Sequence, residues 1–337
     1  MALSSRPGPS VSRFFVAAAM LVAAAPAMAQ GRIEVHATPI PFFDYSNHEL
    51  RRFGKLEFRG GLQLTSPSKA FGGLSSLIME RDGSHFLSAT DNGRWLRGRI
   101  TYSGSAPSGI VDAEMAPMLG ADGKRLAARG WWDTESLAKD DAGNVYVGIE
   151  RVHRVVKFDF GKNGFRARGV PIAVPPEFKS MPLNQSIEAL AVAPQSHPFA
   201  GSLIVISEAD LDAAGNIKAW LLGGPSPGAF AVKRTDDFDV TDCALLPDGD
   251  LLILERRISW LRGPAARIRR IAAGAVRPGA IVDGEQLLYA DVKQQFDNFE
   301  GLGVHRTAKG ETVLTIISDD NFSALQRTLL MQFTPLQ

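Results

Sequence analysis

The segment Val240–Arg257, "VTDCALLPDGDLLILERR", decides the fold. It holds an apolar run that opens with an acid, a Pro-Asp-Gly turn, and a second apolar run that ends at Glu255-Arg256-Arg257. Two short apolar runs on either side of such a turn are typical of a β-hairpin. Nearly the same pattern recurs five times along the chain, with acidic residues at the same two places.

The repeated units set the organisation of the chain. They begin at Phe71, Asp133, Ser186, Val240 and Asn298, 53 to 62 residues apart. This spacing matches one four-stranded propeller blade, and each unit has room for two strands beyond its hairpin. Helical periodicity is almost absent. We therefore predict an all-β fold, a single β-propeller with five four-stranded blades.

The two ends of the repeat region are expected to close the ring. The fifth unit is short, with only "TLLMQF" before the C-terminus, whereas the N-terminal "KLEFRGGLQL" at residues 55–64 has no unit of its own. This N-terminal strand would supply the missing outer strand and leave no free sheet edge. Six blades are the alternative if residues 33–64 build more than one strand. A β-sandwich ranks lower because it would not need the repeat.

Residues 1–29 have the layout of a secretory signal peptide. Arg6 and Arg13 precede the apolar run "FFVAAAMLVAAAPAMAQ", which ends in the small-residue site Ala27-Met28-Ala29 before Gln30. We expect general secretion to the periplasm or the medium, and one propeller domain over residues 30–337. No later stretch is apolar enough to span a bilayer, so the mature chain is expected to have no membrane span.

Composition excludes several classes of function. Without Arg6 and Arg13 the 37 basic residues become 35, against 36 acids, so the mature chain lacks the basic excess that nucleic-acid binding needs. Cys243 is the only cysteine, which rules out an intrachain disulfide and predicts a small buried side chain. There is no G-x-S-x-G motif, and the six histidines lack metal-binding spacing. Both facts argue against a serine nucleophile and a zinc site.

The acids of the five units are predicted to meet at one end of the propeller. The start of one hairpin strand and the end of its partner lie at the same edge of a blade. The first positions hold Gly72, Glu135, Glu188, Asp242 and Glu300. The second positions hold Asp91, Glu150, Glu208, Glu255 and Asp319. The sequence therefore predicts a ring of carboxylates at one mouth of the channel, broken in the first unit at Gly72.

A ring of this kind needs compensating charge. Two unit charges ~4 Å apart repel by roughly 4 kcal/mol at an effective dielectric constant of about 20. Ca²⁺ suits carboxylate and amide oxygens better than zinc does, so a calcium site is expected. The expected ligands are Asp91, Glu150, Asp242, Glu255, Glu300, Asp319 and Asp320. The expected catalytic residues are Glu135 or Glu188 as base, with Arg151 and Arg256 offsetting charge. In the structural alternative, the acids cap backbone amides or pair with arginines.

The same residues resemble a known family, the bacterial phytase-like ("esterase-like activity of phytase") β-propellers. The resemblance rests on "FGGLSSL" and "DGSHFLSATDNGR", "DTESLAKDDAGNVYVGIER", "IEALAV" with "ISEAD", and "NFEGLGV" with "ISDDN", and covers about residues 71–333. It implies a secreted or periplasmic propeller that hydrolyses phosphoesters or esters. On that resemblance the site would comprise Asp91, Glu135, Glu150, Arg151, Glu188, Glu255, Arg256, Glu300, Asp319 and Asp320.

The leading prediction is a monomeric, periplasmic, Ca²⁺-assisted hydrolase of a small phosphoester or ester. Phytate itself is not expected, because the basic stretch "KFDFGKNGFRAR" at residues 157–168 lies away from the acids and a less anionic substrate fits an acidic mouth better. One alternative is a non-catalytic propeller that binds a protein or a cell-envelope ligand. A sugar-lactone hydrolase of propeller type is a third reading, chemically close to the first.

Overall fold

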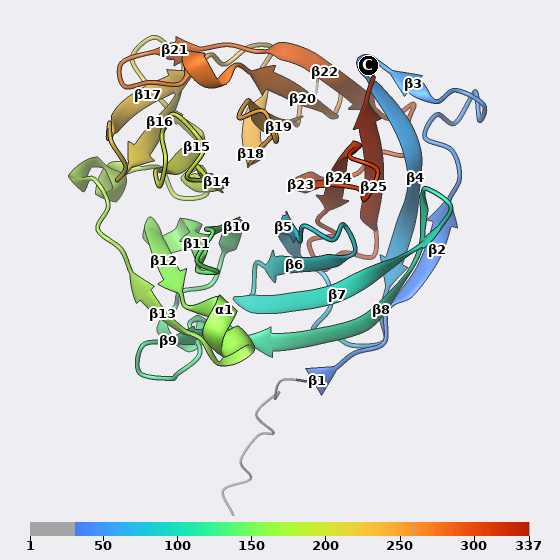
Figure 1. Ribbon diagram of the computed structural model, residues 1–337, viewed down its shortest axis with the longest axis horizontal. Helices are drawn as coiled ribbons and strands as arrows, with labels where there is room; N and C mark the ends of the chain where they lie inside the picture. The colour runs from blue at the N-terminus through green and yellow to red at the C-terminus, as the bar shows by residue number, and fades with distance from the viewer. Residues whose placement is uncertain (1–30, 260, 337) are drawn as a thin grey trace, which may run out of the picture.

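The chain forms a five-bladed β-propeller, as predicted (Figure 1). The computed structural model describes residues 31–259 and 261–336, so the predicted signal peptide lies outside the described residues. Each sheet radiates from a central channel, and each innermost strand contacts the innermost strands of both neighbouring blades. No helix in the described part is long and apolar enough to cross a membrane.

The first three blades follow one another along the chain, and each is built from the inside outward. Blade 1 contains β5 (Leu74–Met79), β6 (His85–Thr90), β7 (Arg94–Ser103), β8 (Ala106–Pro117) and, outermost, β1 (Gly31–Arg32). Blade 2 contains β10 (Thr134–Lys139), β11 (Val145–Ile149), β12 (Arg154–Phe158), β13 (Arg168–Pro171) and β9 (Leu119–Gly120). Blade 3 contains β14 (Ile187–Val192), β15 (Leu203–Leu211), β16 (Ile217–Leu222), β17 (Gly228–Val232) and β21 (Ile281–Val282).

The last two blades complete the circle. Blade 4 contains β18 (Asp239–Leu245), β19 (Leu251–Arg257), β20 (Ala265–Ile271) and β22 (Glu285–Asp291). Blade 5 contains β23 (Phe299–Arg306), β24 (Thr312–Ser318), β25 (Thr328–Pro335), β4 (Leu56–Thr65), β2 (His36–Ile40) and β3 (Arg52–Phe53). The antiparallel pairing of β4 with β25 confirms the predicted N-terminal closure. Sequence analysis missed the short outer strands β1, β9 and β21.

The helical elements are short. The described residues form one four-residue helix, α1 (Phe160–Asn163), and the 3-10 turns η1 (Ala127–Arg129), η2 (Glu150–Val152), η3 (Gly164–Arg166), η4 (Pro176–Ser180) and η5 (Ala273–Ala275). They connect strands and cover no sheet face of their own.

The hydrophobic core is divided into five clusters, one between each pair of neighbouring blades. For example, Val240 and Ile253 of blade 4 pack with Ile204 and Ile206 of blade 3. The β-strand period of two explains this arrangement, because alternate side chains of each strand face the blades on either side. The ring of blades therefore holds itself together through contacts between consecutive units.

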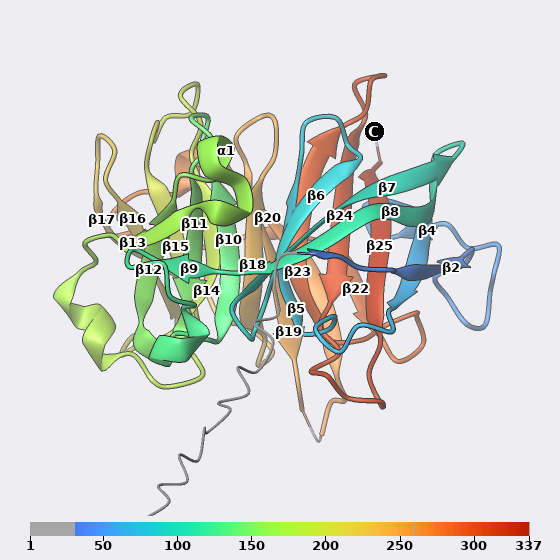
Figure 2. The ribbon, with the colours of Figure 1, turned by 90° about the horizontal axis from the view of Figure 1, so that it is seen from below.

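The two ends of the propeller are built differently (Figure 2). At one end the inner hairpins turn tightly, and glycines with left-handed φ, such as Gly143 (83°) and Gly249 (96°), close the turns. At the other end the inner strands begin and the longer loops connect the blades. The predicted acids belong to this second end.

Candidate functional site at the acidic mouth

Every innermost strand carries a β-bulge at the same level. In each blade the pairing with the second strand skips one residue near the start of the inner strand, and the skipped residues are Ser75, Glu135, Glu188, Thr241 and Glu300. A bulge re-aims one side chain without ending the strand, and bulges are common beside active sites. The five bulges thus bring glutamates from blades 2, 3 and 5 to one level around the axis.

The end of each second strand adds one more charged side chain at this level. The residues there are Asp91, Glu150, Glu208, Arg256 and Asp319, each one position beyond the residue that pairs with the start of the bulge. We call the seven carboxylates Asp91, Glu135, Glu150, Glu188, Glu208, Glu300 and Asp319 the acidic ring. The structure therefore brings together residues that the sequence spreads over five units.

In blade 4 the predicted alignment of the repeat was wrong by one residue. The bulge lies at Thr241, between Val240 and Asp242, and Glu255 pairs with Val240. Thr241 and Arg256 therefore occupy the ring positions that the sequence assigned to Asp242 and Glu255. Because side chains alternate along a strand, a shift of one residue turns a side chain to the opposite face. In blade 1 the equivalent position is Ser75 and not Gly72.

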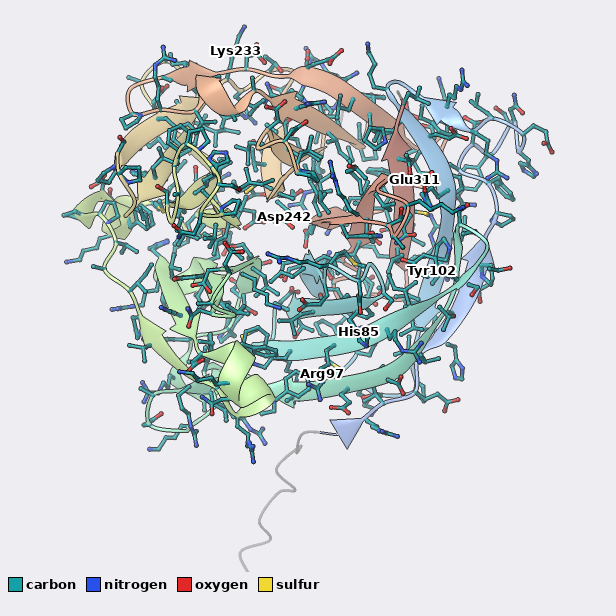
Figure 3. The ribbon with its side chains drawn as sticks, in the orientation of Figure 1. His85, Arg97, Tyr102, Lys233, Asp242 and Glu311 are labelled. Carbon is teal, nitrogen blue, oxygen red and sulfur yellow. The ribbon has the colours of Figure 1, made fainter. Side chains whose placement is uncertain are left out.

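Asp242 joins two blades below the ring. Its Oδ1 accepts a hydrogen bond from the Cys243 amide at 2.8 Å, and its Oδ2 accepts one from the Leu302 amide of blade 5 at 2.7 Å. The side chain is buried close to the axis, as Figure 3 shows. Both oxygens already accept hydrogen bonds from backbone amides, so Asp242 acts in this structure as a link between β18 and β23.

Glu255 lies outside the ring, in the outer part of blade 4. It is fully buried between the guanidinium groups of Arg267 and Arg269, with four nitrogen–oxygen distances of 2.7 to 3.1 Å. Such paired, bidentate contacts fill the hydrogen-bonding capacity of a carboxylate. The structural alternative raised by the sequence therefore describes Glu255 well.

Asp320 and Arg151 lie at the edge of the acidic mouth. Asp320 accepts hydrogen bonds from the Gly73 amide (2.9 Å), the Phe322 amide (3.0 Å) and the Thr328 hydroxyl (3.0 Å), which ties blade 5 to blade 1. Arg151 is exposed, and its guanidinium lies 4.1 Å from the centre of the Trp132 ring. Among the predicted site residues these two are peripheral, whereas Glu135, Glu188 and Arg256 belong to the mouth itself.

Burial and mutual repulsion raise the pKa values of six carboxylates of the acidic ring, Asp91, Glu135, Glu150, Glu188, Glu208 and Asp319. Burial is the larger cause, and neighbouring carboxylates add to it: the pKa of Asp91 rises to about 7 and that of Asp319 to about 9, each with a contribution from Glu300. The pKa of Glu150 rises to about 7. Burial also raises the pKa values of Glu135 and Glu188 well above the ordinary range. The neighbouring carboxylates Asp91 and Glu300 add to the raised pKa of Glu135.

Arg256 is the cation of the ring. Its guanidinium bonds Glu300, Asn298 and, at 3.0 Å, Glu208. Burial lowers the pKa of Arg256, but the surrounding glutamates outweigh this and raise it. Glu208 keeps a pKa of about 6, raised by burial and held down by Arg256. Glu208 was recognised in the repeat but not expected in the site, because nothing in a linear sequence shows that Arg256 would point at it.

Two ring oxygens are buried without a partner in the described part of the chain. These are Asp91 Oδ1 and Glu188 Oε2, and the Glu188 residue is only 6% exposed. An all-oxygen donor set with surplus negative charge fits a hard divalent cation such as Ca²⁺. Within residues 31–259 and 261–336, however, no three His, Cys, Asp or Glu side chains already form a metal-binding group. The donor chemistry fits a cation, and binding would require these side chains to converge.

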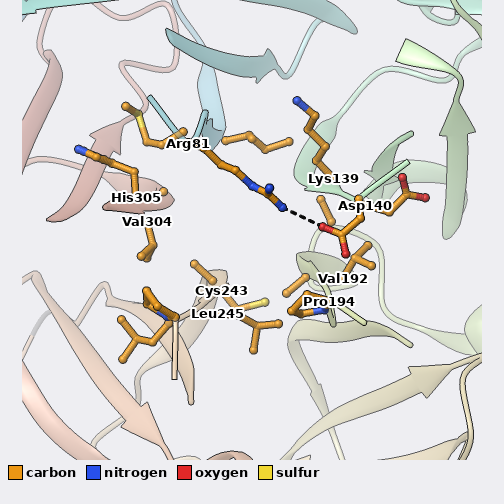
Figure 4. A pocket seen from close by; sticks show the side chains of 18 of the residues that line it. Arg81, Lys139, Asp140, Val192, Pro194, Cys243, Leu245, Val304 and His305 are labelled. Carbon is orange, nitrogen blue, oxygen red and sulfur yellow. Dashed lines mark hydrogen bonds and ion pairs between the residues drawn. The ribbon is translucent and has the colours of Figure 1, made fainter. Parts of the chain in front are cut away.

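A large cavity opens at the opposite end of the channel (Figure 4). It measures about 1060 Å³, and the inner strands line it with apolar residues such as Val192, Cys243, Leu245 and Val304. Its rim is charged but internally neutralised, as in the Arg81–Asp141 ion pair of 3.1 Å. His305 lies there with a pKa lowered by burial to about 4. None of the acidic ring lines this cavity, so the two ends of the channel are chemically distinct.

A comparison with known protein families identifies the family of this chain. Residues 69–322 match the phytase-like family, described as "esterase-like activity of phytase". The chain belongs to the phytase-like family. The match spans all five inner hairpins and every member of the acidic ring. No curated protein matches the chain.

Solved structures show only distant likeness to this phytase-like chain. An α-L-arabinofuranosidase from Podospora anserina has 11% identity and a TM-score of 0.48, over 83% of this chain and 97% of that one. A protein of unknown function from Dyadobacter fermentans has 9% identity and a TM-score of 0.41, over 90% and 99%. The Cps50 (Swd1) β-propeller domain from Myceliophteria thermophila has 13% identity and a TM-score of 0.34, over 75% and 68%. Likeness at this level carries no functional information.

Proposed function

We propose that this phytase-like propeller hydrolyses a small ester or phosphoester at its acidic mouth, with assistance from a bound divalent cation, Ca²⁺. The observation that carries the proposal is the acidic ring, in which Asp91 Oδ1 and Glu188 Oε2 are buried and unpartnered among the described residues. Burying anions without compensation is costly, and a binding site is the usual reason for keeping them. Membership of the phytase-like family supports a hydrolase.

The ring residues divide the chemistry among them. A bound cation would neutralise part of the ring and polarise an oxygen of the substrate. Asp91 and Glu150, with pKa values of about 7, suit proton transfer near neutral pH, beside Glu135 and Glu188. In hydrolysis, the water oxygen bonds to the acyl carbon or phosphorus while the bond to the leaving oxygen breaks. One water proton passes to an ionised ring carboxylate, the hydroxyl stays on the acyl carbon or phosphorus, and the leaving oxygen takes up a proton from a protonated ring carboxyl group.

The test is calcium titration by calorimetry after chelation, together with turnover of a panel of esters and phosphoesters. In the double variant Glu135→Gln with Glu188→Gln we expect calcium binding and turnover to be lost while the fold is retained. Glu49→Gln changes an exposed acid outside the ring and serves as the matched control. Wild-type protein without activity under any divalent cation would contradict the hydrolase proposal.

The second candidate is a non-catalytic propeller that binds a protein or cell-envelope ligand. The buried network of Arg256 with Glu208, Glu300 and Asn298 favours it, because that network stabilises the mouth without any ligand. A large fall in melting temperature of the double variant, with calcium binding unchanged, would support this candidate.

The same proposal includes secretion. The arrangement of residues 1–29 supports a signal peptide, with residues 30–337 as the mature periplasmic or secreted domain. N-terminal sequencing of the exported protein should begin near Gln30. Retention of Met1 in the exported protein would contradict cleavage.

A further inference from the structure

The acidic ring already accommodates one organic cation, supplied by the chain itself. Arg256 reaches into the ring from blade 4 and bonds carboxylates from blades 3 and 5. On the side of blades 5, 1 and 2, no such cation is buried among the carboxylates in the described part of the chain. There Asp91 and Glu300 repel both Glu135 and Asp319. This side of the mouth therefore has an excess of negative charge, which a second cation would balance.

An aromatic ring borders the same spot. A Cβ added at Gly73 would collide with the ring of Phe322 and lie 3.0 Å from Asp91 Oδ2. Phe322 is 43% exposed, and its backbone has a φ of 51°, which is strained for a bulky residue. The three hydrogen bonds to Asp320 hold this strained segment in place. The structure thus holds an exposed aromatic face beside a half-buried carboxylate, one of whose oxygens is buried without a partner among the described residues.

A second aromatic ring at this mouth already carries a cation. The Arg151 guanidinium lies over Trp132, and its charge acts on the neighbouring Asp133, which in turn acts on Asp91. An ammonium or guanidinium over an aromatic face gains roughly 0.5–2 kcal/mol, and acids nearby add to the attraction. The combination of carboxylates and exposed aromatic rings is the chemistry that recognises organic ammonium groups.

Exposed apolar side chains surround this end of the propeller. They lie on the loops that lead into or out of the strands of blades 3, 4 and 5, and they are Leu183, Ile258, Leu261, Val292 and Leu325. These exposed side chains offer apolar contacts at the rim of the mouth. A ligand with an ammonium group and an apolar arm would meet carboxylates in the mouth and apolar contacts at its rim.

We propose that the side of the acidic mouth formed by Asp91, Asp133 and Phe322 binds an organic ammonium group, and that the ester or phosphoester substrate carries it. Only the second part of this inference, that the substrate carries the ammonium group, rests on the proposed hydrolase function. It predicts a substrate class, positively charged amphiphilic esters, whose charge is opposite to that of the acidic mouth. The binding half is independent of catalysis.

The binding test compares choline with its uncharged isostere 3,3-dimethylbutan-1-ol by calorimetry, in chelator and at constant ionic strength. Choline should bind at least tenfold more tightly than the alcohol. Phe322→Leu keeps the apolar volume but removes the aromatic face, and it should weaken choline binding by roughly 2- to 30-fold. Val170→Ala, which changes a 55% exposed residue of β13 outside the mouth, should leave binding unchanged. Circular dichroism checks that Phe322→Leu is folded.

The outcomes separate this inference from the proposed function. Absence of choline binding, or equal binding of choline and the alcohol, overturns the ammonium site. Turnover is then compared for acetylcholine and 3,3-dimethylbutyl acetate, and for the two corresponding phosphate esters, with Ca²⁺ present. Equal turnover within each pair leaves the hydrolase standing and overturns the ammonium substrate. Choline binding without turnover of any ester supports the ammonium site and contradicts the hydrolase.

Discussion

Blades 3 and 4 have the same hairpin pattern but bury their acids in opposite ways. In blade 3, Glu188 lies in the bulge with one oxygen unpartnered among the described residues, and burial raises its pKa well above the ordinary range. In blade 4, Glu255 is equally buried but is held by Arg267 and Arg269. A buried carboxylate with its partners belongs to the fold, whereas one without them destabilises the fold and suits a ligand.

The largest loss of stability is expected when the contacts of Glu255 with Arg267 and Arg269 in blade 4 are disrupted. In Glu255→Gln, the guanidinium groups of Arg267 and Arg269 lose the charge between them, and the free energy of unfolding should fall by about 3–5 kcal/mol. Urea unfolding measures this change. A loss of less than 1 kcal/mol would show that the three residues contribute little to stability, and the contrast between the two blades would fail.

Removing Arg256, the cation of the ring, should lower the free energy of unfolding somewhat less, and the size of this loss should depend on pH. Arg256→Gln leaves Glu208 and Glu300 without their charge partner, so at pH 8 we expect a loss of about 2–3 kcal/mol. Near pH 5 the neighbouring raised-pKa carboxylates are protonated, and the loss should be smaller. Unfolding at the two pH values checks this, and an equal loss at both would contradict a charge-based role.

The wild-type protein should itself become less stable as the pH rises. Asp91, Glu150 and Asp319 have folded-state pKa values of about 7, 7 and 9, above their ordinary values of 3.8, 4.5 and 3.8. From about pH 4 upward the unfolded chain loses these protons first, so stability declines until the folded-state pKa values are passed. Differential scanning calorimetry in chelator should show a lower melting temperature at pH 8 than at pH 5. Calcium should reduce the difference, and a rise in melting temperature with pH would contradict unpaired burial of the ring.

Sequence analysis predicted the blades well because their signals are local. The hairpin turns, the apolar runs and the closing strand at residues 55–64 each depend on neighbouring residues. It placed Glu135, Glu188 and Glu300 at one mouth because three units align without ambiguity. It misplaced Asp242 and Glu255, because the bulge at Thr241 is set by pairing between strands and a shift of one residue leaves the repeat looking almost the same. The role of Glu208 beside Arg256 depends on contacts between blades, which no spacing reveals.

The smallest change in stability is expected at Glu188, the partly unpartnered carboxylate of blade 3. Glu188→Gln removes a charge whose repulsion by Glu208, Glu135 and Glu150 opposes folding, so its free energy of unfolding at pH 8 should stay within about 1 kcal/mol of wild type or rise. Because the raised pKa of Glu188 favours its protonated form at lower pH, the variant should match the wild type more closely still at pH 5. Urea unfolding at both pH values, run beside Glu255→Gln, makes the contrast direct. If Glu188→Gln lost several kcal/mol at pH 8, the ionised Glu188 would have to be making stabilising contacts in the fold. The mouth would then be a structural network of the same kind as blade 4, and the case for a ligand there would pass to Asp91 alone.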